Sequence, residues 1–219
     1  MTKEELAGRI DLTLLRPEAT EMDIDALVRD GLKYPFASVC VPPCHVGLAK
    51  SLIKENPLKI TTVTGFPLGF SSPNAKLFEA VEAFGAGASE IDTVINISLL
   101  RSGRTSAVEK EIRQIVKTLP CAVIKVIIET CYLTDEEKKL ALNLSINAGA
   151  RFVKTSTGFG PGGARAEDIR LLSDSALGRI LIKASGGIKT TEDALKMVEA
   201  GAERIGTSSG AGIIEGLKG

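Results

Sequence analysis

Short apolar runs rich in β-branched residues alternate along the whole chain with segments in which apolar residues recur at helical spacing. The first kind of run is typical of buried strands, and the second is typical of amphipathic helices. The predicted strands cover residues 10–14, 37–41, 59–64, 90–95, 122–129, 152–155, 180–184 and 204–207. The helices that follow them are predicted to begin near Met22, Cys44, Pro73, Ser106, Thr134, Ala166, Thr191 and Ser209.

These eight strand–helix units, with one short extra helix in front, predict the fold. An unbroken βα series implies parallel strands joined by right-handed crossovers, and eight units can close into a barrel. The chain of 219 residues has the length of such a barrel, and no linker-like stretch or charge block divides it. We therefore expect an α/β protein, a single (β/α)8 TIM-barrel domain over residues 1–219 with a short N-terminal helix. Two helices carry start signals, because Thr134 and Thr191 each place a hydroxyl ahead of carboxylates.

Composition and charge narrow the class of protein. Hydrophobic residues make up 44% of the chain and charged residues 25%, which is the profile of an ordinary globular protein. Lys+Arg and Asp+Glu both number 27, so the balanced charge argues against nucleic acid or an anionic membrane as the main partner. No apolar run approaches 18 residues, so we expect no membrane span. Four cysteines are few for this length and favour a reducing, cytoplasmic location.

Three lysines interrupt strands that should be wholly apolar. Lys125, Lys154 and Lys183 are spaced at about one βα unit each, in strands that helices cover outside and side chains fill inside. A buried ammonium needs a partner, a lowered pKa or access to solvent. Any one of these lysines, taken alone, could equally be a non-functional residue at a strand end whose ammonium group reaches solvent. Three on adjacent strands indicate a functional site.

A weak internal repeat points to residues that share a layer with one of these lysines. Gly87, Gly149 and Gly201 each end a predicted helix, and five residues after each lie Asp92, Lys154 and Gly206. Because side chains in one layer of a barrel come from alternate strands, these positions are predicted to meet near the carboxyl-terminal mouth.

Such an arrangement favours imine chemistry without a metal or other cofactor. A neutral lysine attacks a carbonyl to form a Schiff base, and a second ammonium nearby helps it to lose its proton. We expect Lys154 and Lys183 to divide these roles, with Asp92 moving protons. A substitution Lys183→Leu is expected to leave folding nearly intact while changing the pH at which Lys154 becomes neutral.

Glycine-rich segments follow the last three predicted strands, at residues 157–163, 185–187 and 206–210. Loops after the seventh and eighth strands frequently bind phosphate in this fold, because bare backbone N–H groups can approach the anion. A single glycine pair is more often a plain turn, but two such loops in these places favour phosphate binding.

Seven segments, taken in order, resemble the deoxyribose-phosphate aldolase family over about residues 10–212. They are Asp11-Leu-Thr-Leu-Leu, Ser38-Val-Cys-Val, Thr62-Val-Thr-Gly-Phe-Pro-Leu-Gly, Glu90-Ile-Asp-Thr-Val-Ile-Asn, Lys125-Val-Ile-Ile-Glu-Thr, Phe152-Val-Lys-Thr-Ser-Thr-Gly-Phe and Ile182-Lys-Ala-Ser-Gly-Gly-Ile. The resemblance implies a class I aldolase that cleaves 2-deoxy-D-ribose 5-phosphate reversibly to D-glyceraldehyde 3-phosphate and acetaldehyde, in deoxyribose phosphate catabolism.

The resemblance also implies roles for individual residues. Lys154 is expected to form the Schiff base, Asp92 to give and take protons, and Lys183 to tune Lys154. The expected substrate-pocket residues are Asp11, Cys40, Lys125 and Thr155. The expected phosphate-binding residues are Gly158, Gly186, Gly187, Ser208 and Ser209.

Two departures from the family and several alternatives stay open. Phe159 stands where some members carry a lysine. Some members also end in a tyrosine credited with proton transfer, whereas the only tyrosines here are Tyr34 and Tyr132, so Asp92 and water are expected to take over that role. The rivals are a transaldolase-like or isomerase barrel and a catalytically silent phosphosugar-binding protein. Lys125 can also serve as a structural ion-pair partner, and we expect a homo-oligomer, either a dimer or a tetramer.

Overall fold

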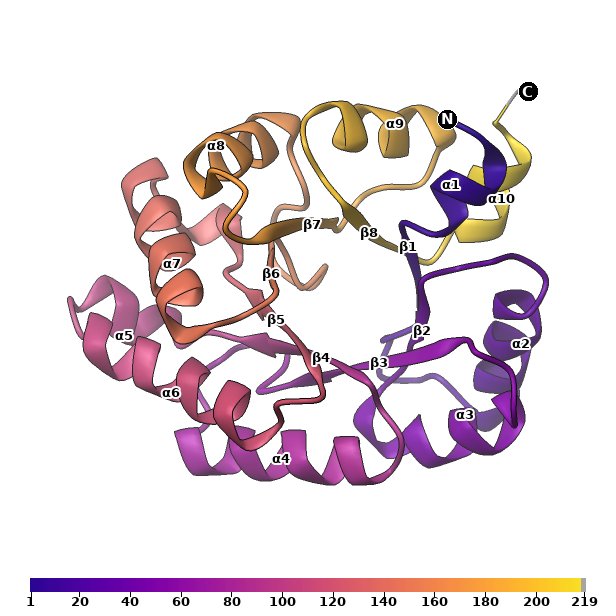
Figure 1. Ribbon diagram of the computed structural model, residues 1–219, viewed down its shortest axis with the longest axis horizontal. Coiled ribbons are helices and arrows are strands. Elements are labelled where there is room, and N and C mark those ends of the chain that lie inside the picture. Colours follow the sequence, from indigo (N-terminus) through magenta and orange to yellow (C-terminus); the bar gives the residue numbers. More distant parts are fainter. Residues whose placement is uncertain (218–219) are drawn as a thin grey trace.

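The strands of the computed structural model, which describes residues 1–217, form one closed parallel barrel. Each strand pairs with its neighbour in sequence, and β8 pairs back with β1. Helices form an outer ring around the strands (Figure 1). The predicted (β/α)8 barrel is therefore confirmed, while residues 218 and 219 of the predicted domain lie outside the described residues.

All eight predicted strands are present, with bounds within about two residues of the expected ones. They are β1 (Ile10–Thr13), β2 (Ser38–Cys40), β3 (Lys59–Thr64), β4 (Glu90–Val94), β5 (Val123–Ile127), β6 (Phe152–Lys154), β7 (Leu181–Ser185) and β8 (Arg204–Thr207). The largest difference is at β5, which ends before Glu129. Glu129 adopts a left-handed backbone conformation with φ 51°, which turns the chain out of the sheet.

The helices also follow the predicted order. They are α1 (Lys3–Ala7), α2 (Glu21–Gly31), α3 (Val46–Ile53), α4 (Pro73–Gly85), α5 (Ile97–Arg101), α6 (Thr105–Thr118), α7 (Asp135–Ala148), α8 (Ala166–Ala176), α9 (Thr191–Glu199) and α10 (Gly210–Glu215), with 3-10 turns at Pro43–His45 and Thr130–Tyr132. Helix α1 is the expected extra N-terminal helix. The sequence patterns missed α5, although Asn96 marks its start by accepting a hydrogen bond from the Leu99 N–H.

The helix start signals are confirmed at one site and displaced at the other. Thr134 caps α7 and forms a capping box with Glu137. For α9 the capping residue is Thr190 and not Thr191, because it is Thr190 that bonds to the N–H three residues on, at Asp193. Thr191 is the first helical residue, and its hydroxyl donates to the carbonyl of Ile213 in α10.

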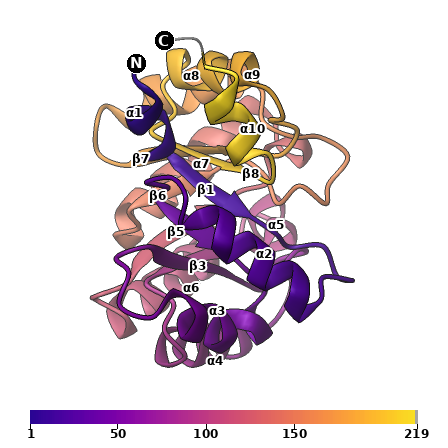
Figure 2. The ribbon, with the colours of Figure 1, turned by 90° about the vertical axis from the view of Figure 1, so that its right-hand side faces the viewer.

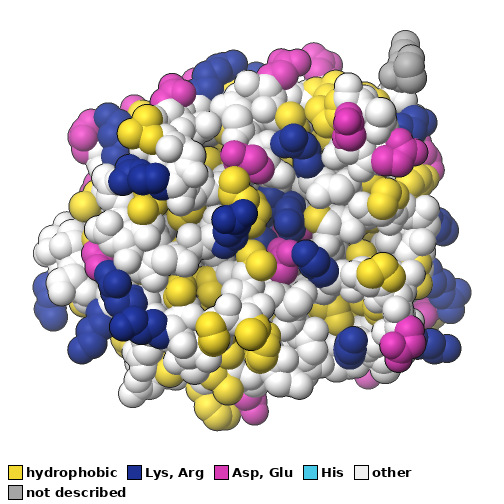
Figure 3. Space-filling view, in the orientation of Figure 1, with side chains coloured by type: hydrophobic (Ala, Val, Ile, Leu, Met, Phe, Trp, Pro, Cys, Tyr) yellow, Lys and Arg dark blue, Asp and Glu magenta, His cyan; other side chains and the backbone are white. Residues whose placement is uncertain are grey.

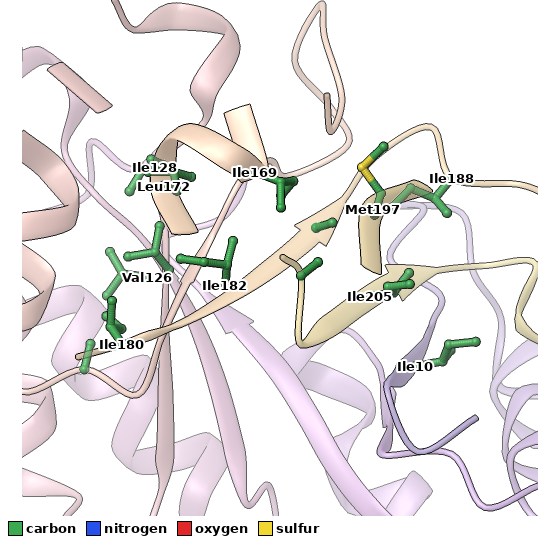
Figure 4. Close-up of a cluster of buried hydrophobic side chains, with 14 of the residues drawn as sticks. Ile10, Val126, Ile128, Ile169, Leu172, Ile180, Ile182, Ile188, Met197 and Ile205 are labelled. Carbon is green, nitrogen blue, oxygen red and sulfur yellow. The ribbon is translucent and has the colours of Figure 1, made fainter. Parts of the chain in front are cut away.

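Side chains along the strands point alternately outward, into an apolar layer beneath the helices, and inward, into a charged interior. Ile10, Ile182 and Ile205 point outward and pack in the hydrophobic cluster with helix residues such as Ile169 and Met197 (Figure 4). Because successive side chains point to opposite faces of a strand, the residues next to them in sequence enter the barrel. Several of those inward residues are charged and fully buried.

The two ends of the barrel differ. In Figure 2 strand β1 runs toward the right-hand side, where the loop that follows β6 projects. Figure 1 therefore views the barrel from the end at which the strands begin, with their carboxyl ends behind. None of the helices within residues 1–217 combines the length and apolarity needed to cross a lipid bilayer.

Candidate active site

A cavity of about 310 Å³ opens at the carboxyl ends of the strands. Loops that follow β1, β6, β7 and β8 form its walls, and the side chain of Lys154 lines it. This is the end of a TIM barrel at which active sites are found, and the volume suits a small phosphorylated sugar.

Lys154 is the last residue of β6 and lies beside Lys183 in the strand register. Its side chain is almost fully buried, with 2% of the residue exposed. Nζ of Lys154 donates a hydrogen bond of 2.9 Å to Oδ2 of Asp92 on β4, two strands away in the barrel. The amine is thus removed from bulk water yet open to the cavity, as a nucleophile requires.

Lys183 points to the same place from β7. Its Nζ donates a hydrogen bond of 2.8 Å to Oδ2 of Asp92 and a second, shorter one to Oδ2 of Asp11. Since Lys154 and Lys183 share one oxygen, their nitrogens lie within about 6 Å, the sum of the two distances, where like charges disfavour each other. The sequence pattern placed Lys154 and Asp92 together, and the structure brings them into direct contact.

Gly206 makes room for Lys183 in this arrangement. A Cβ at Gly206 would lie 3.2 Å from Cε of Lys183 and 3.0 Å from Cβ of Ser185. The absence of a side chain at Gly206 therefore leaves the space through which the Lys183 side chain extends. The three helix-ending glycines of the repeat, at positions 87, 149 and 201, all have positive φ, as the pattern predicts.

Lys125 belongs to the ionic interior and not to the cavity wall. It is fully buried, and its Nζ lies 2.6 Å from Glu90 Oε2, 2.9 Å from Asp92 Oδ1 and 3.7 Å from Asp11 Oδ2. The alternative interpretation, a structural ion-pair partner of Asp11 or Asp92, matches these contacts. The structure adds Glu90 as its nearest partner.

The pKa values of the central groups diverge. Burial by itself would raise the pKa of Asp92, but Lys125, Lys154 and Lys183 hold that pKa well below its usual range. Burial would lower the pKa of Lys183, yet Asp11 and Asp92 raise it above the ordinary lysine value. Before substrate binds, Lys183 is accordingly a cation and Asp92 an anion at neutral pH.

The pKa of Lys154 moves in the opposite direction to that of Lys183 and is lowered. Burial contributes most, Asp92 opposes it, and the nearby charge of Lys183 lowers the pKa further. The sequence argument placed the cause chiefly in the second cation. The structure gives that role first to desolvation, because the side chain of Lys154 is enclosed in the barrel.

The other expected pocket residues, Asp11, Cys40 and Thr155, are not among the residues that line the cavity. Asp11 is fully buried and accepts from Lys183 and from the hydroxyl of Ser38. Cys40 is fully buried, and burial raises the pKa of its thiol to about 11, so it is a neutral thiol at pH 7. Thr155 joins β6 to β7, because its hydroxyl donates to the Ser185 carbonyl and accepts from the Ser185 N–H, each at 3.2 Å.

Four of the five expected phosphate-binding residues line the cavity. Gly186 and Gly187 have φ of 88° and 80°, a conformation that suits glycine, and they line the cavity together with Gly158 and Ser208. Ser209 is not in the lining; its N–H donates to the hydroxyl of Thr207.

The sequence argument missed two cations that line the cavity, Arg16 and Lys189. Both follow strand ends, at β1 and β7, which is the signal that could have identified them. Phe159 also lines the cavity and packs edge-on against Phe66, with ring centroids 5.3 Å apart. Lys189, on the loop that follows β7, brings a positive charge to the same lining.

Glu129 is another residue that the sequence argument passed over. Its carboxylate accepts from the N–H of Thr157, at 3.2 Å, and from the hydroxyl of the same residue. These bonds tie the loop that follows β6 to the end of β5. Glu129 thereby holds the segment that carries Gly158 and Phe159 in place over the cavity.

The comparison with known families agrees with this geometry. A family model described as DeoC/LacD family aldolase matches residues 7–218. The chain belongs to this aldolase family.

Individual relatives support the assignment. The chain is 52% identical over 213 residues to the deoxyribose-phosphate aldolase of Thermoanaerobacter sp. (strain X514), covering 96% of both chains. It is 52% identical over 215 residues to that of Clostridium kluyveri, covering 98% of this chain and 99% of the other. The tetrameric deoxyribose phosphate aldolase of Aeropyrum pernix superposes with a TM-score of 0.92 at 39% identity, covering 98% of this chain and 91% of that one.

Proposed function

We propose that this enzyme cleaves 2-deoxy-D-ribose 5-phosphate reversibly to D-glyceraldehyde 3-phosphate and acetaldehyde, through a Schiff base on Lys154. The observation that carries the proposal is the Lys154–Asp92–Lys183 arrangement at the base of the cavity. Relatives at about half identity are named for this activity. The catalytic unit is a single TIM-barrel domain, residues 1–219.

The neutral amine of Lys154 attacks C1 of the open-chain sugar, and loss of water gives a protonated imine. A base then takes the proton of the C3 hydroxyl, the C2–C3 bond breaks, and its electron pair moves into the imine to give an enamine. Glyceraldehyde 3-phosphate departs at this step. Protonation of C2 and attack by water release acetaldehyde and restore the amine.

Asp92 and Lys183 support these proton transfers in different ways. Asp92 contacts the Lys154 nitrogen directly, so it is placed to take and return protons during imine formation and hydrolysis, with water as the carrier. Lys183 keeps its charge and lies close to the same nitrogen, so it favours the neutral form of Lys154.

The remaining proposed residues divide between the pocket floor and the phosphate site. Asp11, Cys40, Lys125 and Thr155 form or brace the floor beneath the reacting carbons. Gly158, Gly186, Gly187, Ser208 and Ser209 belong to the phosphate site, where Ser209 acts by holding the loop that carries Ser208. Lys189 and Arg16 provide the positive charge that a phosphate dianion attracts.

We further propose that the enzyme acts in the cytoplasm as a homo-oligomer, either a dimer or a tetramer. Helix α4 exposes Phe78, Val81 and Phe84 on one side, with 63%, 41% and 36% of each residue accessible. Hydrophobic side chains project at the lower edge in Figure 3, where α4 lies. Exposed apolar groups of this kind suit contact with a second copy. A substitution Phe78→Glu is expected to lower the mass measured by light scattering.

Borohydride reduction in the presence of acetaldehyde tests the central proposal. The expected result is one added ethyl group, located by peptide mass spectrometry on Lys154, and its loss in Lys154→Ala. An isomerase or a silent binding protein would form no such adduct. Label on Lys183 in place of Lys154 would reverse the assigned roles of the two lysines.

A further inference from the structure

The ion pairs around Lys154 continue through the barrel to its opposite end. Asp92 and Glu90 lie two residues apart on β4 and therefore point to the same side, one layer apart. Glu90 Oε2 contacts both Lys125, at 2.6 Å, and Arg204 Nη1, at 2.9 Å. Arg204 is the first residue of β8, so the contacts reach the end of the barrel where the strands begin.

A second branch joins the same two ends. Nη1 of Arg204 donates a hydrogen bond of 2.6 Å to Oδ1 of Asp11, and the other oxygen of Asp11 accepts from Lys183. Both branches meet at Asp92, which contacts Lys154. A solvent-exposed charge lies at the far end, where Lys59 Nζ is 3.9 Å from Glu90 Oε1. Figure 3, which views this end, shows basic and acidic side chains meeting at the centre of the barrel.

The charges within this network have a definite balance. Within the barrel the carboxylates of Asp11, Glu90 and Asp92 face three cations other than Lys154, which are Lys125, Lys183 and Arg204. Lys59 approaches Glu90 from the exposed rim and is not counted among them. Three negative charges and three positive charges therefore cancel when Lys154 is neutral. A proton on Lys154 adds an unbalanced charge to a region shielded from water, where charge is costly.

The titratable groups that face Lys154 come from four elements. They are Cys40 on β2, Asp92 on β4, Glu129 after β5 and Lys183 on β7. Cys40 is uncharged at pH 7, and the carboxylate of Glu129 bonds to Thr157 and to Cys131, outside the network. The charge balance reaches Lys154 chiefly through Asp92 and Lys183.

We propose that Glu90 and Arg204 are positioning residues of the active centre, which control the protonation of Lys154 from the opposite end of the barrel. Neither lines the cavity, so neither touches substrate. They act by setting the number of charges in the network and by orienting Asp11 and Lys125. The proposal rests on the proposed function only in taking Lys154 as the reactive amine.

Opposite substitutions are expected to have opposite effects. Glu90→Gln removes a negative charge, so Lys154 loses its proton at lower pH; Arg204→Gln removes a positive charge, so Lys154 keeps its proton to higher pH. We expect the pH at which half of the Lys154 amines are deprotonated, the midpoint, to move by at least about half a pH unit in each variant. The double variant Glu90→Gln/Arg204→Gln restores the balance and is expected to return near the wild-type midpoint.

The readout is the pH dependence of acetylation of Lys154 by acetic anhydride, followed on its peptide by mass spectrometry. This reaction needs only a neutral amine, and its midpoint does not depend on how much enzyme is active. The matched controls are Asp25→Asn and Arg29→Gln, which carry the same charge changes in a surface ion pair on α2 and are expected to leave the midpoint unchanged.

The proposal would be overturned if Glu90→Gln and Arg204→Gln had the same midpoint as the wild-type enzyme. It would also be overturned if both variants moved the midpoint in the same direction. If these buried variants do not fold, Lys59→Glu provides the test, because 57% of the Lys59 side chain is exposed and the substitution can keep the fold. It places a negative charge beside Glu90 and is expected to raise the midpoint; no change would overturn the proposal. Failure of wild-type enzyme to form the acetaldehyde adduct would instead contradict the proposed function.

Discussion

Lys154 and Lys183, on adjacent strands, donate hydrogen bonds to the same oxygen of Asp92. One carboxylate oxygen thereby holds the proposed nucleophile and a second lysine close together. Lys183 has a second carboxylate, Asp11, and Lys154 has none, which explains why their pKa values move in opposite directions. The two lysines therefore differ in pKa because they differ in the number of carboxylates that they contact.

The same relationship changes what we expect of Lys183→Leu. The sequence alone suggested nearly intact folding, but the substitution would leave Asp11 and Asp92 buried with fewer cations. Breaking a buried pair in this way costs about 3–5 kcal/mol of the free energy of unfolding. Urea unfolding is expected to show this loss, whereas Lys189→Leu, at an exposed lysine, is expected to change stability little. A stable Lys183→Leu would mean that the stranded carboxylates take up protons without penalty.

The lowered pKa of Lys154 predicts the pH dependence of imine formation. Below that pKa the amine is protonated and cannot attack, so the rate of adduct formation with acetaldehyde is expected to fall as the pH falls. Its midpoint should lie below 10.5, the ordinary lysine value. Acetaldehyde carries no titrating group, so the measurement reports the enzyme alone. A midpoint at or above 10.5 would contradict the role given to burial.

Cys40 is expected to resist alkylation in the folded enzyme. It is buried with a raised pKa, whereas Cys44, Cys121 and Cys131 are exposed. Iodoacetamide at pH 8 should therefore modify three cysteines in native enzyme and four after denaturation, as counted by mass spectrometry. The variant Cys40→Ser should show three in both conditions. Rapid modification of Cys40 would place it in open contact with solvent.

Lys189 is expected to contribute to phosphate binding and not to the chemistry. Lys189→Gln removes a positive charge from the cavity lining, so KM for 2-deoxyribose 5-phosphate should rise by about tenfold, equivalent to about 1.4 kcal/mol, with kcat little changed. The control substrate is unphosphorylated 2-deoxyribose, whose kcat/KM should be unaffected. An equal decrease of kcat/KM for both substrates would indicate a general disturbance of the loop after β7.

The periodicity of the chain was sufficient to predict the barrel. Alternating strand and helix patterns have few physical solutions, because each apolar face must be buried and parallel strands need crossovers. The lysines in apolar strands led to the proposed reactive centre for a similar reason, since a charge in a predicted core needs an explanation. The boundary at Glu129 was missed because left-handed backbone at a non-glycine residue has no reliable sequence signal.

The amino-acid sequence by itself determined the order of elements, the closed sheet and the lysines that reach its interior, because all three follow from local spacing. Only the tertiary structure decided which carboxylate each lysine meets, and hence which lysine keeps its proton. Asp11 and Arg204 come from the first and last strands, far apart in sequence, which barrel closure brings into contact. Electrostatic energies depend on such distances and on burial, and neither can be read from spacing along the chain.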